Sequence, residues 1–85
     1  MYRVSEVLRI THGQDGAILL DVERGQIFTL NPVASRILQL LQSQHDPAQI
    51  AHDISETYQM NLETVKQDLG EFLQQMQGSE LIEEC

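Results

Sequence analysis

Three histidines, His12, His45 and His52, are the side chains of this 85-residue sequence that most readily bind metals or transfer protons near neutral pH. The two spacings typical of zinc sites are both missing, since no two histidines stand four residues apart and no cysteine pair occurs. The single cysteine is the last residue, Cys85, and we interpret it as an incidental thiol. We therefore predict surface histidines, with neither a metal nor a cofactor.

Motifs of covalent and phosphate chemistry are missing too. No serine stands at a strand-to-helix elbow, and the five glycines are scattered rather than gathered in a phosphate-binding loop. No Asp-Ser pair occurs, which is where acyl and peptidyl carrier proteins attach phosphopantetheine. We predict that the chain is neither an enzyme nor a carrier.

Any binding surface must be positioned by strands in the first third of the chain and by helices in the rest. Ile18, Leu20 and Val22 recur with period 2, which predicts that they form the buried face of one strand. Turns over residues 13–16 and 23–25 join this strand to a neighbour on either side, and the glycine of the second turn suits a left-handed position. We expect an antiparallel meander. Its first strand would carry Val4, Val7, Leu8 and Ile10.

Capping residues mark the starts of three helices. Asn31 and Asp46 each precede a proline, which is the sequence of a cap followed by the first helical position. Three residues after Asp46 a glutamine can complete a capping box, and Asn61 can cap the third helix. Gly78 is expected to stop that helix. Residues 79–85 would then form a short extended tail that packs back onto the body.

A three-stranded antiparallel sheet followed by three helices, in one α+β domain over residues 1–85, has the outline of a winged helix. In a winged-helix DNA-binding protein, the third predicted helix, residues 62–76, would be the recognition helix. It carries one cation, Lys66, and three carboxylates, so its surface would repel phosphates. DNA binding is thus a weaker alternative from another functional class.

The net charge limits the classes of partner, and the absence of targeting segments limits the cellular location. Thirteen acidic side chains against five basic ones give a formal charge of −8, which disfavours nucleic acids and anionic membranes. The sequence has neither an apolar run of membrane-spanning length nor a secretory signal at its start. We expect a cytoplasmic protein.

The third predicted strand, residues 26–31, has no charged side chain and no proline before the helix. As an edge of the meander it lacks the features by which natural edges usually avoid pairing. A peptide can pair with such an edge through backbone hydrogen bonds, while pockets select its side chains. Alternatively, the protein's own third helix or tail covers this edge. The apolar stripe over residues 65–76 is equally open to two interpretations, as core or as binding surface.

The run from Gly16 to Leu41 resembles the PqqD-like family of peptide-recognition proteins. The resemblance rests on the order and spacing of several features and extends over about residues 4–82. The matching features are Gly16-Ala17-Ile18-Leu19-Leu20-Asp21, Gly25-Gln26-Ile27-Phe28-Thr29-Leu30-Asn31, Ala34, Ile37, Leu38, Leu40 and Leu41, then Ile50, Tyr58, Val65, Asp68, Phe72 and Leu73.

This resemblance implies a winged-helix variant that recognises peptides, known as a RiPP recognition element. The leader segment of a ribosomally made precursor would add as a strand to the third strand, in the groove against the third helix. Gln26, Ile27, Phe28, Thr29 and Leu30 would supply the backbone ladder. Val65, Leu69, Phe72 and Leu73 would form pocket walls, and Asp68 would meet a polar or basic leader group.

A free-standing chain of this length resembles the discrete type from lasso-peptide biosynthesis. That type works with a separate cysteine-protease-like leader peptidase and an ATP-dependent cyclase. The alternative within the same mechanism is a peptide chaperone for pyrroloquinoline quinone or another RiPP. In either role the chain would raise the effective concentration of the precursor near its enzyme.

Overall fold

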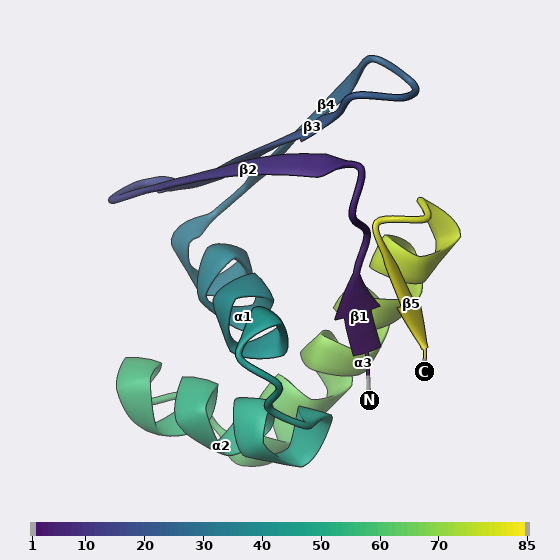
Figure 1. Cartoon of the computed structure of the whole chain (residues 1–85). Coiled ribbons are helices and arrows are strands. Elements are labelled where there is room, and N and C mark those ends of the chain that lie inside the picture. The colour runs from purple at the N-terminus through teal and green to yellow at the C-terminus, as the bar shows by residue number, and fades with distance from the viewer. Residues whose placement is uncertain (1, 85) are drawn as a thin grey trace.

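The computed structural model describes residues 2–84, and within them the chain forms two antiparallel sheets and three helices (Figure 1). The larger sheet has the strand order β2 (Leu8–Gly13), β3 (Gly16–Asp21), β4 (Gln26–Leu30), and the smaller pairs β1 (Tyr2–Val4) with β5 (Ile82–Glu84). The helices are α1 (Pro32–Gln42), α2 (Pro47–Tyr58) and α3 (Leu62–Gly78). All three lie on one side of the larger sheet (Figure 1). The predicted α+β architecture of a three-stranded sheet with three helices is confirmed.

The hydrophobic core lies between the larger sheet and the helices. Leu19 of β3 is fully buried together with Leu38 and Leu41 of α1 and Ile50 and Ile54 of α2. The third helix contributes one buried row, consisting of Val65, Leu69, Leu73 and Met76. No helix within residues 2–84 is long and apolar enough to cross a membrane.

The predicted buried face of β3 was wrong by one residue. Ile18, Leu20 and Val22 are 53%, 37% and 48% exposed, whereas Leu19 and Ala17 point into the core. Every position from Ala17 to Leu20 is apolar, so the period-2 pattern fits either face of the strand equally well. Local sequence therefore could not choose the face, and the packing of Leu19 against the helices determines it.

A buried carboxylate and a close backbone approach accompany this register. Asp21 lies on the core side and is only 4% exposed, and its Oδ1 accepts hydrogen bonds of 3.0 Å from the backbone amides of both Glu23 and Arg24, which satisfy this buried oxygen. At the other end of β3, Gly16 has a φ of +131°, and a Cβ there would stand 1.8 Å from the carbonyl oxygen of Leu30. Only glycine allows β3 and the end of β4 to approach so closely.

The predicted first strand is two strands that belong to different sheets. β1 and β2 are separated by residues 5–7, and β1 pairs with β5 from the far end of the chain. The Ser5 amide extends this contact by donating to the carbonyl oxygen of Leu81 over 2.9 Å. The prediction that the tail packs back is confirmed, since Leu81 and Ile82 are each 3% exposed. Cys85 lies outside the described residues.

The predicted helix starts are confirmed. The side-chain oxygens of Asn31 and Asn61 accept hydrogen bonds from backbone amides in the first turns of α1 and α3. Asp46 and Gln49 form the predicted capping box at the start of α2, with bonds of 2.8 and 3.0 Å. The predicted stop at Gly78 was wrong, because Gly78 is the last residue of α3, Ser79 is its C-cap, and the left-handed residue that follows is Glu80, with a φ of +59°.

Candidate functional site

β4 is an edge strand of the larger sheet. It follows the turn at Gly25, whose φ of +69° is the predicted left-handed conformation. On one side it pairs with β3, from Gln26 opposite Asp21 to Leu30 opposite Ala17, and within residues 2–84 no strand pairs with its other side. Neighbouring residues of a strand direct their backbone N–H and C=O groups to opposite edges. About half of the backbone groups of β4 therefore point away from β3.

A hollow of about 180 Å³ lies between β4 and the C-terminal half of α3. None of its lining side chains is charged, although the chain as a whole carries a formal charge of −8. This hollow suits an apolar group that enters beside the free edge of β4. The lining residues are Phe28, Thr29 and Leu30 of β4, Phe72, Gln75 and Met76 of α3, and Ser79 and Leu81 after α3.

Four of the ten residues implied by the family resemblance meet at this hollow. They are Phe28, Thr29, Leu30 and Phe72. Two others, Gln26 and Ile27, lie earlier on β4, and both are exposed. The side chain of Ile27 is 68% exposed on the opposite face of the sheet from Phe28. These two residues continue the strand edge beyond the hollow without lining it.

The other residues implied on α3 do not line the hollow. Val65, Leu69 and Leu73 are each 3% or 4% exposed, and they pack in the core. Asp68 is exposed, four residues before Phe72 and therefore on the same side of the helix. The buried three hold α3 in position, whereas Asp68 extends the row of side chains that begins at the hollow.

Four lining residues were not among the ten implied ones, namely Gln75, Met76, Ser79 and Leu81, although Met76 belongs to the apolar stripe over residues 65–76. The pattern that could have found two of them starts at Phe72, because residues three and seven positions later lie on the same side of a helix. Gln75 and Ser79 are polar, so they do not belong to the apolar pattern from which the binding surface of α3 was predicted. Leu81 belongs to the tail over residues 79–85 that was predicted to pack back, but its position depends on the pairing of β5 with β1.

A larger hollow, of about 690 Å³, lies around β1, β5 and the end of α3. Its walls include several carboxylates, and Arg3 forms an ion pair with Glu83 beside it. It does not reach β4. We consider the smaller hollow the better candidate because it alone combines uncharged walls with an unpaired strand edge.

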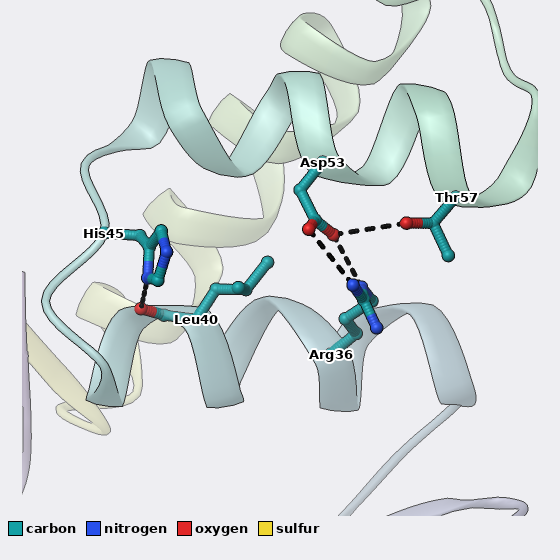
Figure 2. A network of polar contacts seen from close by, with 5 residues as sticks. All are labelled: Arg36, Leu40, His45, Asp53 and Thr57. Carbon is teal, nitrogen blue, oxygen red and sulfur yellow. Dashed lines mark hydrogen bonds and ion pairs between the residues drawn. The ribbon is translucent and has the colours of Figure 1, made fainter.

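The best-formed ion pair in the described chain joins α1 to α2 (Figure 2). Arg36 donates from Nε to Asp53 Oδ1 over 2.5 Å and from Nη2 to Oδ2 over 3.0 Å, and Thr57 adds a longer hydrogen bond to Oδ1. The hydrogen bond from Arg36 lowers the pKa of Asp53, and the same bond raises the pKa of Arg36. This pair lies away from β4 and supports the helix packing.

Two of the histidines also make contacts within the fold. The Nδ1 atom of His12 on β2 lies 2.9 Å from the hydroxyl oxygen of Ser35, which is buried on α1. That of His45 lies 3.3 Å from the carbonyl oxygen of Leu40 (Figure 2). Both contacts connect neighbouring elements, and neither histidine lines the hollow beside β4.

Residues 16–82 match the family model described as coenzyme PQQ synthesis protein D (PqqD). The chain belongs to the PqqD family. The resemblance expected from the sequence is thereby confirmed, and the match includes the whole of β3, β4 and the three helices.

Two solved structures share the fold of this PqqD-family chain. One is described as "TbiB1 in Complex with the TbiA(beta) Leader Peptide" and is 32% identical in sequence. The match covers 98% of the present chain and 96% of the TbiB1 chain, with a TM-score of 0.90. The other, "Lasso peptide synthetase B1 complexed with the leader peptide", is 22% identical, covers 98% of both chains and has a TM-score of 0.89. No curated protein sequence matches the chain.

Proposed function

We propose that this PqqD-family chain binds the leader segment of a ribosomally synthesised precursor peptide as an additional strand on the free edge of β4. The observation that carries the proposal is the unpaired edge of β4 beside an uncharged hollow formed with α3. The 32% identical TbiB1 was solved in complex with a leader peptide, and this supports the same type of ligand here. Backbone hydrogen bonds to β4 would supply affinity that depends little on leader sequence.

The hollow would select one leader side chain. Its volume of about 180 Å³ is smaller than the roughly 300–1,000 Å³ of sites for drug-sized ligands, so it suits a single large side chain. Phe28 and Leu30 would contact this group from the strand, and Phe72 and Met76 from the helix. We therefore propose that the leader presents an aromatic or branched aliphatic residue here.

Polar contacts would fix the position of the leader along the groove. Gln75 and Ser79 line the same hollow and can hydrogen-bond to a leader backbone or side chain. Asp68 lies one helical turn before Phe72 and is exposed, so a basic or polar leader residue can reach it. Val65, Leu69 and Leu73 would act indirectly, by holding α3 at the correct distance from β4.

The bound leader would tether the attached core peptide to the chain. We propose that the chain thereby delivers the precursor to a separate cysteine-protease-like leader peptidase and an ATP-dependent cyclase in lasso-peptide maturation. The chain itself would make or break no bond, because its contribution is a raised effective concentration of precursor near each enzyme. A peptide chaperone for pyrroloquinoline quinone or another RiPP would use the same site and mechanism.

A fluorescence-polarisation titration tests leader binding. The probe is the fluorescein-labelled leader of the precursor encoded beside this chain, and the control is a scrambled peptide of the same composition. We expect saturable binding of the leader and at least tenfold weaker binding of the scrambled peptide. Equal binding of the two peptides, or no binding of either to the folded protein, would contradict the proposal.

A further inference from the structure

The face of the larger sheet that points away from the helices is apolar and exposed. We call it the outer sheet face, and its paired positions are Arg9, Thr11, Ile18, Leu20, Ile27 and Thr29, with Val22 beside them. Four of the six large apolar side chains that are exposed in the described chain belong to it. Such side chains gathered on one surface are typical of an interaction site.

The outer sheet face also differs from the rest of the molecule in charge. None of its paired positions is acidic, although the chain has thirteen acidic side chains. Arg9 is opposite Leu20, and within residues 2–84 it is the one cationic Lys or Arg side chain for which no ion pair is formed. A cation on an apolar, acid-free surface favours a partner that presents apolar side chains and a carboxylate.

A protein partner fits this surface better than a second copy or a membrane. In a twofold, face-to-face dimer the two Arg9 side chains would enter the same interface, and no carboxylate of the outer sheet face would be there to pair with them. An anionic membrane would be repelled by a chain with a net charge of −8. The remaining occupant is another protein with a complementary surface.

The outer sheet face lies next to the proposed leader site, and this position indicates which kind of protein docks on it. Ile27 and Thr29 belong to β4, whose free edge is the proposed leader site. A leader added there would become a fourth strand, and every second leader side chain would extend the outer sheet face. An enzyme that docks on this extended surface would contact the chain and its leader together, and so would favour the loaded chain over the empty one.

We propose that the outer sheet face, extended by the bound leader, is the docking surface for the peptidase that removes this leader. The inference rests on the proposed function, since the leader forms part of the surface. It adds a second face to the chain, one that recognises the enzyme while the groove against α3 recognises the leader. A carboxylate on the peptidase pairs with Arg9, and its apolar side chains cover Ile18 and Leu20.

The experiment uses the full chain, the labelled leader and the purified peptidase encoded beside them. Peptidase binding to the immobilised chain is measured by biolayer interferometry with and without saturating leader, and leader affinity is measured separately. One variant reverses the charge, Arg9→Glu. The other removes apolar surface from β3 by introducing threonine, a β-branched residue that strands favour, through Ile18→Thr together with Leu20→Thr.

Matched controls change the same properties elsewhere. Met60→Thr removes an apolar side chain that is 37% exposed, like Leu20, and Lys66→Glu makes the same change in net charge as Arg9→Glu. We expect leader to strengthen peptidase binding to wild type. Both outer-face variants should weaken it about tenfold or more, whereas both controls stay within about twofold of wild type. Leader affinity should be unchanged in all four.

Failure of the proposed function and failure of the docking surface give different results in this experiment. If wild type does not bind leader, the proposed function is wrong. If leader binds normally but the outer-face variants bind peptidase as tightly as wild type, the docking surface alone is overturned. A dimer of wild type, detected by light scattering and abolished by Arg9→Glu, would assign the face to a second copy and also overturn it. Vesicle binding that depends on Ile18 and Leu20 would assign it to a membrane. Because Arg9 is exposed, its variant keeps the experiment decisive even if the double variant unfolds.

Discussion

Phe28 of β4 and Phe72 of α3 line the same hollow, although they lie in different halves of the sequence. Each aromatic side chain is half-buried, so each retains surface that a ligand can cover. The free edge of β4 runs beside them. This combination allows one ligand to form backbone hydrogen bonds and to insert a side chain at the same place.

Replacing Phe72, the aromatic residue that α3 contributes to the hollow, should lower leader affinity strongly and the free energy of unfolding only moderately. We expect Phe72→Ala to lower leader affinity about tenfold or more and to reduce the free energy of unfolding by about 1–3 kcal/mol, less than a fully buried Phe would cost. Fluorescence polarisation measures the first and urea unfolding the second. Leu69→Ala is the control, because Leu69 is buried away from the hollow: it should cost about 2–5 kcal/mol of stability but leave the affinity of the folded protein within about threefold.

Asp68, which lies one helical turn before Phe72, should contribute to leader affinity through its negative charge. We expect Asp68→Lys to weaken binding of a leader that carries a basic residue opposite it, because attraction becomes repulsion, and to weaken it less at high salt. Glu56→Lys makes the same charge change at an exposed position of α2. If the two variants bind leader equally well, Asp68 has no place in the site.

Two glycine substitutions should have opposite effects on stability. Gly16→Ala places a Cβ 1.8 Å from the carbonyl oxygen of Leu30 at a φ of +131°, and we expect a loss of about 3 kcal/mol or more. Gly70→Ala adds a methyl group to an exposed position of α3 with no atom within 4 Å, and should stabilise the protein by about 0.5–1 kcal/mol. Thermal melts compare both with wild type. Equal melting temperatures for the two variants would disprove the close approach of β3 to the end of β4.

The ion pair between α1 and α2 should give a small acid-sensitive contribution to stability. Because Arg36 lowers the pKa of Asp53, the contribution is present above the ordinary aspartate pKa and is lost as the pH falls through the lowered folded value. We expect Asp53→Asn to cost about 0.5–1 kcal/mol at pH 7, since both side chains are about one-third exposed. This cost should shrink at about pH 3. Urea unfolding at the two pH values measures it. Glu56→Gln, which removes an exposed carboxylate of α2, should show no such change.

The features that local sequence determines could be predicted. Asn31, Asp46 and Asn61 cap helices through side chains that bond to amides only a few residues away, so short-range patterns were sufficient. The uncharged edge of residues 26–30 could also be recognised, because the absence of charge is visible in the sequence itself.

Features that depend on distant contacts could not be predicted. Pairing of β1 with β5 joins the two ends of the chain and divides the predicted first strand. The buried face of β3 depends on which of Ile18 and Leu19 packs against the helices, and both are apolar. Likewise, the rotation of α3 about its axis buries Leu69 and turns Gln75 toward β4. The family resemblance implied a groove between β4 and α3, where a hollow lies, but three residues that it implied as groove walls, Val65, Leu69 and Leu73, are buried in the core.

An amide-resolved NMR experiment with the unlabelled leader tests the central claim most directly. We predict chemical-shift changes concentrated on residues 26–31 and 68–81, together with slower hydrogen exchange at alternate amides of β4, because a new strand would bond to those that point away from β3. Leader binding that leaves the exchange of every β4 amide unchanged, with shifts elsewhere on the folded protein, would contradict strand addition to this edge.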